Sequence, residues 1–135
     1  MTKENAFHLA LQVHLTAIQN RDLDAFLNTI VSDGQLTLIL PNGKLLHDYK
    51  DIVSLHQEWF SDPDWEMHTE LLSTHESIDM ASALLWVDYK DIDREGNPIQ
   101  LHYYLSLLFA RQDDKWLVIH DQNTITKIVT ENEND

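Results

Sequence analysis

The sequence predicts an α+β domain in which two or three helices pack inside a strongly curved antiparallel sheet and enclose a cone-shaped pocket. Apolar residues recur at helical spacing before residue 61. Four long segments between residues 65 and 127 alternate with period two, and short polar turns join them. A chain of 135 residues has room for one compact domain with a real core, and for no second one.

Three helices are expected in the first half of the chain. The first carries an apolar stripe from Phe7 to Ile18. Asp22 can cap a second, shorter helix that ends near residues 32–34, and Asp48 can cap a third that ends before residues 61–64. We therefore expect a helix, a brief break and a second helix, with the third helix arriving after a hairpin.

The strands are expected to form a hairpin and then a meander. Residues 36–40 and 44–46 flank the turn 41–43, which contains Asn-Gly. Later strands are expected at about 65–73, 80–92, 99–111 and 115–127. The domain is expected to span residues 1–127, and the acidic segment 128–135 is expected to be a disordered tail.

Charge and composition exclude several classes of function. The net charge of −14 repels phosphate backbones and anionic lipid surfaces, so nucleic acid and membrane partners are not expected. Without cysteine there is no disulfide, thiolate nucleophile or Cys-based metal site. The eight histidines form no metal-binding motif, and no glycine-rich nucleotide loop occurs, so neither a metal nor a cofactor is expected. The first residues lack an apolar signal core, which favours the cytoplasm.

The strongest candidate for chemistry is Asp121. Leu117 and Ile119 are followed at period two by Asp121 and Asn123, so one face of the last strand is expected to begin apolar and end polar. A carboxylate at that point is partly desolvated and can exchange a proton near neutral pH. Alternatively, Asp121 accepts hydrogen bonds from a neighbouring strand or a dimer partner, or faces solvent. His120 is expected on the opposite, outer face, together with Trp116 and Val118.

Trp86 and Asp88 share a face of an earlier strand. If Asp88 reached the same cavity as Asp121, the two carboxylates would separate their proton affinities and divide acid and base roles. An equally supported reading makes Asp88 a solvated residue near a strand end. Tyr103 and Tyr104 point to opposite faces, and we take Tyr103 as the ligand-binding candidate, although a bulge could exchange the two.

His14 and His56 lie on the apolar stripes of the first and third helices. Each could shuttle a proton or donate a hydrogen bond to a ligand, which makes both catalytic candidates. The alternative is that each is a core histidine with its hydrogen bonds satisfied. Trp59, on the third helix, is a further candidate for contacting an apolar ligand together with Trp86 and Asn123.

The order of elements resembles the SnoaL-like branch of the nuclear transport factor 2-like superfamily, a cystatin-like α+β cone. The matching features run from about Phe7 to Lys127; they are Leu40-Pro41-Asn42-Gly43, Glu58-Trp59-Phe60, an aspartate-rich turn before Trp116, and His120-Asp121-Gln122-Asn123-Thr124. The chain is also similar to the association domain of calcium/calmodulin-dependent kinases.

The resemblance implies a role for Asp121, because a cavity aspartate carries acid–base work in the polyketide-cyclase relatives. Asn123 and Asp88 stand where the kinase association domain has basic pocket residues. The sequence predicts a homodimeric protein that binds a small apolar organic molecule in a pocket. If it is an enzyme, the expected activity is that of a cofactor-independent isomerase, cyclase or dehydratase. The alternative is a non-catalytic ligand-binding or association module, since the fold alone does not assign chemistry.

Overall fold

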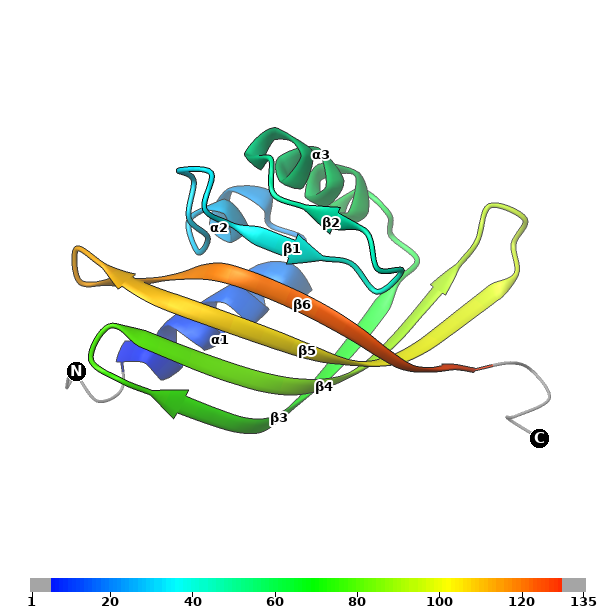
Figure 1. Ribbon diagram of the computed structural model, residues 1–135. Coiled ribbons are helices and arrows are strands. Elements are labelled where there is room, and N and C mark those ends of the chain that lie inside the picture. The colour runs from blue at the N-terminus through cyan, green and yellow to red at the C-terminus, as the bar shows by residue number, and fades with distance from the viewer. Residues whose placement is uncertain (1–5, 130–135) are drawn as a thin grey trace.

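The computed structural model describes residues 6–129, which form three helices and a six-stranded sheet (Figure 1). The helices are α1 (Ala6–Gln19), α2 (Leu23–Leu27) and α3 (Tyr49–Phe60). The strands are β1 (Thr37–Ile39), β2 (Leu45–Leu46), β3 (Glu66–Glu76), β4 (Met80–Ile92), β5 (Pro98–Gln112) and β6 (Lys115–Val129). Their order across the sheet is β2-β1-β6-β5-β4-β3.

Both predicted helix caps are present. The carboxylate of Asp22 accepts a hydrogen bond of 3.1 Å from the backbone N–H of Ala25, and that of Asp48 accepts one of 3.0 Å from Lys50. Each cap satisfies a backbone donor that the first turn of a helix leaves without a partner. These two aspartates therefore set where α2 and α3 begin.

Helix α2 ends earlier than the sequence predicts, at Leu27 instead of near residues 32–34. The reason is a competing backbone pairing with β6: Val31 N–H donates to Val118 O over 3.1 Å, and Val118 N–H donates to Thr29 O over 2.9 Å. Ile30 consequently forms an isolated parallel bridge to Val118. Local apolar spacing does not reveal this tertiary pairing.

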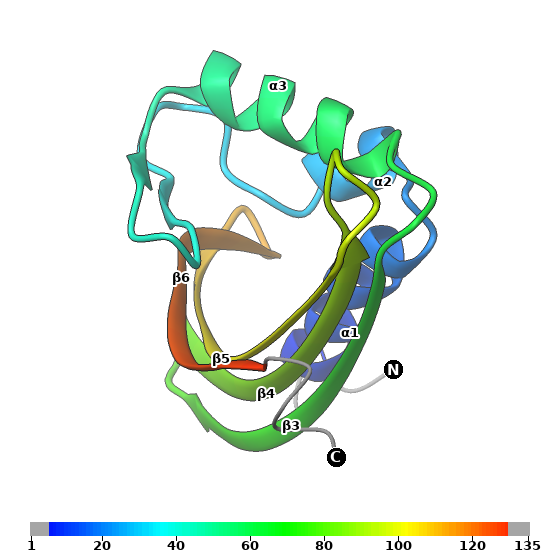
Figure 2. The ribbon, with the colours of Figure 1, turned by 90° about the vertical axis from the view of Figure 1, so that its right-hand side faces the viewer.

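The meander of four long strands is confirmed, since β3, β4, β5 and β6 pair antiparallel in sequence order. The first hairpin extends this sheet through a parallel contact, in which Leu38 of β1 lies opposite Asp121 of β6. Viewed along the cone in Figure 2, the long strands curve around α1, while α3 lies across the open side. β6 continues to Val129, so it includes two residues that were assigned to the tail, and the rest of that predicted tail lies outside the described residues.

A β-bulge in β6 decides which side chains face the concave side of the sheet. Phe109 pairs with Val118 and Leu108 pairs with His120, so Ile119 is the extra residue in β6. Trp116 and Val118 are therefore buried on the concave side, and Trp116 packs edge-on against Phe7 at 5.6 Å between ring centroids.

The sequence-based placement of Trp116 and Val118 on the outer face beside His120 is wrong, because it assumed unbroken alternation through β6. Beyond the bulge, the alternation resumes with the opposite phase. Asp121 pairs with buried Leu107, and Asn123 pairs with buried Leu105, so both polar side chains face inward. His120 lies on the convex side, as expected.

Candidate functional site

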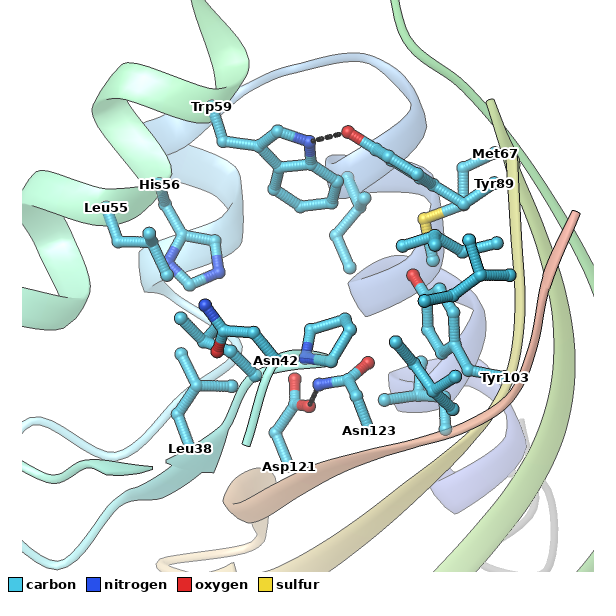
Figure 3. Close-up of a pocket in the computed structure, with 17 residues that line it drawn as sticks. Leu38, Asn42, Leu55, His56, Trp59, Met67, Tyr89, Tyr103, Asp121 and Asn123 are labelled. Atoms are coloured by element: carbon cyan, nitrogen blue, oxygen red, sulfur yellow. Dashed lines mark hydrogen bonds between the residues drawn. The ribbon is translucent and has the colours of Figure 1, made fainter. Parts of the chain in front are cut away.

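A cavity of about 560 Å³ lies between the concave face of the sheet and α3 (Figure 3). Helices α1 and α3, strands β1, β3, β5 and β6, and the segment after β1 supply its apolar wall. The apolar residues are Ile18, Leu38, Leu40, Pro41, Leu55, Met67, Leu101, Leu105, Ile125 and Ile128. The other lining residues are aromatic or polar: Asn42, His56, Trp59, Tyr89, Tyr103, Asp121 and Asn123. Such a pocket, apolar with a few polar groups, has the composition of small-molecule sites in proteins.

Asp121 is the one acidic side chain in this lining, and no lysine or arginine joins it there among residues 6–129. Removal from bulk water raises the pKa of its carboxyl group from 3.8 to about 7, while the hydrogen bond from Asn123 lowers the pKa and opposes part of that rise. The carboxyl group is therefore present in both protonation states near neutral pH.

The amide of Asn123 is held in one orientation. Its Nδ2 donates to the backbone carbonyl of Ile39 over 2.7 Å and to Oδ1 of Asp121 over 3.0 Å. A carbonyl can only accept, so the NH₂ group must face Ile39 and both of its hydrogens are used. The Oδ1 atom of Asn123 is left for the cavity, and Figure 3 shows it on the side away from Asp121.

His56 enters the cavity from α3 with a fixed tautomer. Its Nδ1 lies 2.7 Å from the backbone carbonyl of Ile52, one turn earlier, so Nδ1 carries the hydrogen and donates it. The Nε2 atom then bears a lone pair. Burial lowers the pKa of His56, and the Ile52 hydrogen bond opposes part of this. The ring also stacks on Phe26 at 4.2 Å, which keeps it in place.

Aromatic side chains form another part of the wall. Trp59 Nε1–H donates to the hydroxyl of Tyr89 over 2.9 Å, and this hydroxyl donates to Asp91 Oδ2 over 3.0 Å. Trp59 stacks on Trp65 at 4.6 Å. Burial raises the pKa of Tyr103 above its usual value, so that side chain remains a neutral phenol. These contacts bind α3 to β4 across the cavity.

Of the polar and aromatic residues in this lining, two were missed by sequence reasoning, Tyr89 and Asn42. Tyr89 follows Leu85 and Val87 at period two, so the concave alternation of β4 could have indicated it. Asn42 belongs to the turn between β1 and β2, and no periodic signal reaches it there.

Asp88 and Trp86, two sequence-based candidates, lie on the convex face of the sheet. Asp88 accepts a hydrogen bond of 2.9 Å from Gln100 Nε2 and lies 3.4 Å from His102 Nε2. The ring of Trp86 contacts Tyr104 edge-on at 5.3 Å. Both residues alternate with inward-facing ones in β4, so Asp88 and Asp121 do not converge on one cavity, contrary to the expectation.

His14 is fully buried below the cavity and is not part of its lining. The hydroxyl of Thr29 donates to Phe26 O over 2.6 Å, so it accepts from His14 Nδ1 over 2.7 Å. The Nε2 atom of His14 has no hydrogen-bond partner among the described residues. Burial, and then the nearby His56, lower the pKa of His14 from 6.5 to about 3. The structure thus brings together Asp121, Asn123, His56, Trp59 and Tyr103, and it leaves out His14, Asp88 and Trp86.

Residues 9–126 match the model of the SnoaL-like domain, which is most of the chain. The chain belongs to the SnoaL-like family. No curated protein matches it. The structure of this SnoaL-like chain is similar to many solved structures, and their cystatin-like, nuclear transport factor 2-like fold confirms the predicted fold class.

Three of these structures illustrate the range of the fold. A type 2 hexachlorocyclohexane dehydrochlorinase (LinA) has a TM-score of 0.77 at 12% identity, with 93% of this chain and 86% of that chain covered. A ketosteroid isomerase-like protein from Erwinia carotovora atroseptica has a TM-score of 0.75 at 15% identity, with 90% and 95% covered. The association domain of CaMKII from C. elegans has a TM-score of 0.65 at 18% identity, with 90% and 95% covered. At these identities, they show the fold alone.

A metal centre and a membrane-spanning helix each need features that residues 6–129 of this SnoaL-like chain lack. No three His, Asp or Glu side chains there gather in a way that could hold a metal ion. Nor does any helix in this range have the length and apolar character needed to cross a membrane.

Proposed function

We propose that this protein binds a small, mainly apolar organic molecule in the cavity and transfers protons on it without a cofactor. The observation that carries the proposal is the carboxyl group of Asp121, which lies in an apolar cavity with its pKa raised to about 7. General acid–base catalysis is most effective when the pKa of the catalytic group is near the working pH. The proposal includes a homodimer in the cytoplasm.

In this proposal Asp121 is the catalytic residue. In its ionised form, Oδ2 takes a proton from the bound molecule, and in its protonated form the same group returns it to another atom. Asn123 is a positioning residue, because its hydrogen bond holds Oδ1 of Asp121 and turns the other oxygen toward the ligand. His56 supplies a second proton acceptor through Nε2, whose tautomer the Ile52 carbonyl maintains.

The structural relatives support this chemistry by analogy. One is named a hexachlorocyclohexane dehydrochlorinase and another a ketosteroid isomerase-like protein. Elimination of hydrogen chloride and isomerisation of a ketone both begin with removal of a proton from carbon. An apolar cavity with one carboxyl group suits such a step, because it strengthens the base by desolvation and keeps water away.

The alternative function is a non-catalytic ligand-binding or association module. The similarity to the association domain of CaMKII favours it. It differs from the leading proposal in one measurable respect, since a binding module would hold the same molecule without exchanging its protons.

Deuterium exchange tests the proposal without knowledge of the natural substrate. Apolar ketones such as acetonaphthone are incubated with the protein in deuterated water, and exchange of the hydrogens beside the carbonyl is followed by NMR. We expect the protein to accelerate exchange, and Asp121→Asn to reduce the acceleration by roughly 100-fold. Asp88→Asn is the matched control, because it removes a carboxylate from the convex face and should leave the rate unchanged. Equal rates for Asp121→Asn and the wild-type protein would exclude the role of Asp121.

A further inference from the structure

The polar groups beside Asp121 are mainly hydrogen-bond acceptors. Both amide hydrogens of Asn123 are donated to Ile39 and Asp121, which leaves its Oδ1 as an acceptor. The Nδ1 hydrogen of His56 is donated to Ile52, which leaves Nε2 as an acceptor. The ionised carboxylate of Asp121 can only accept. Three side chains from α3 and β6 thus present lone pairs to the cavity (Figure 3).

Two other polar side chains border this group. The hydroxyl of Tyr103 can accept as well as donate, so it is compatible with either kind of ligand. Asn42 is the exception, because its Oδ1 already accepts from the backbone N–H of Lys44 over 2.9 Å and its NH₂ group is left as a donor. Asn42 is neutral and lies in the turn after β1, so it does not balance the carboxylate.

The charge of the site favours a cationic ligand, just as its free acceptors favour a ligand with hydrogen-bond donors. Asp121 has no cationic partner in the lining formed by residues 6–129, and the chain as a whole carries a net charge of −14. A negative field of this kind raises the local concentration of cations and lowers that of anions. The remaining wall is aliphatic and aromatic and includes Trp59, Tyr89 and Tyr103, which belong to a residue class whose rings can attract cations.

We propose that the cavity selects an apolar primary amine, whose ammonium group binds the carboxylate of Asp121 in a cavity where Asn123 Oδ1 and His56 Nε2 are further free acceptors. An ammonium group has three N–H donors and no acceptor, so it matches side chains whose free sites are acceptors. Its hydrocarbon part would lie against the apolar wall. The inference rests on the same cavity as the proposed function and specifies the class of molecule that enters it. With the amine bound, Asp121 is ionised, which is the form in which it acts as a base.

Three probes with one hydrocarbon skeleton and different charge test this selection. Naphthylmethylamine, naphthylmethanol and naphthoate are titrated separately into the full-length protein by calorimetry at about pH 8, where Asp121 is mostly ionised. We expect the amine to bind at least about tenfold more tightly than the alcohol, because a hydrogen bond to a charged group is stronger than a neutral one. We expect no measurable binding of the carboxylate.

Two variants make the assignment to Asp121 specific. Asp121→Asn should bind the amine and the alcohol with affinities within about twofold of each other, whereas Asp88→Asn should keep the wild-type preference. The two substitutions change the net charge equally, so a preference reduced to the same extent in both would reflect the overall field and overturn the inference. It is also overturned if the alcohol binds the wild-type protein as tightly as the amine, or if none of the probes binds.

The outcome can be separated from that of the proposed function. If proton exchange depends on Asp121 but the amine has no advantage, the class of molecule is wrong and the catalytic role stands. If the amine is preferred through Asp121 but no exchange occurs, the cavity is a binding site for amines and the catalytic proposal falls.

Discussion

The imidazole of His14 donates from Nδ1 to the hydroxyl of Thr29, 2.7 Å away, in a part of the core that water does not reach. Thr29 passes its own hydrogen to Phe26 O over 2.6 Å. This chain of two hydrogen bonds links α1 to the end of α2, while burial keeps His14 neutral. A histidine on an apolar helical stripe is here a buried core residue, with one of its two nitrogens paired.

Replacing Thr29 by Val tests how much this link stabilises the fold. Valine has nearly the same shape but cannot accept from His14, so a buried N–H group would lose its partner. We expect the free energy of unfolding in urea to fall by about 1 to 3 kcal/mol. Thr29→Ser keeps the hydroxyl and should lose less. A Val variant as stable as the wild-type protein would mean that the hydrogen bond contributes nothing net.

The pH dependence of stability should reveal His14 and Asp121 acting in opposite directions. The pKa of His14 falls to about 3 in the folded state, so the unfolded chain binds this proton first as the pH drops below about 6.5, and stability decreases. The pKa of Asp121 rises to about 7, so the folded state binds that proton first between about pH 7 and 4, and stability increases. The two effects largely cancel between about pH 6.5 and 4.

Asp121→Asn removes one side of this balance. Between about pH 6.5 and 4, the unfolding free energy of the variant should decline more steeply than that of the wild-type protein, by up to about 1.4 kcal/mol per pH unit. Urea unfolding over a pH series measures the difference in slope. Parallel profiles for the two proteins would show that Asp121 titrates near its ordinary pKa. Asp88→Asn serves again as the control.

The hydrogen bond between Trp59 and Tyr89 should stabilise the wall of the cavity. Tyr89→Phe keeps the ring but leaves Trp59 Nε1–H without its acceptor at 2.9 Å. We expect a loss of about 0.5 to 1.5 kcal/mol in unfolding free energy and a weaker affinity for naphthyl ligands. Tyr49→Phe, at the first residue of α3 and outside the cavity lining, is the matched control. Equal losses in both variants would argue against a specific role for the Trp59–Tyr89 contact.

The predicted homodimer should form through the convex face of the sheet. Trp86 and Tyr104 contact each other there, and Tyr104 is 38% exposed. Light scattering should give twice the chain mass of 15.8 kDa at micromolar concentration. Trp86→Arg should produce the monomer mass, whereas Ile78→Arg, in a turn where Ile78 is 82% exposed, should not. A monomeric wild-type protein would contradict this prediction.

The elements of this fold could be predicted from local patterns in the sequence. Helix caps at Asp22 and Asp48, alternation in β4 and β5, and short polar turns are properties of neighbouring residues, so no tertiary information is needed to recognise them. The inward position of Asp121 was also expected. The alternation used to predict it was wrong, however, because it placed Leu117 on the same face as Asp121. The buried residues in that part of β6 are Trp116 and Val118.

By itself, the sequence determined the α+β class, the order of its elements and a carboxyl group near the end of an apolar strand. Tertiary structure decided which side chains meet. One extra residue in β6, Ile119, reverses the faces of the residues that follow it as far as Ile125, after which the register shifts a second time. The position of this bulge depends on the pairing of β6 with β5 across the sheet. Asp88 faces outward because β4 has no such bulge opposite β5. Burial, which raises the pKa of Asp121, is likewise a property of the assembled cavity, since it requires walls from β1, α3 and β6 together.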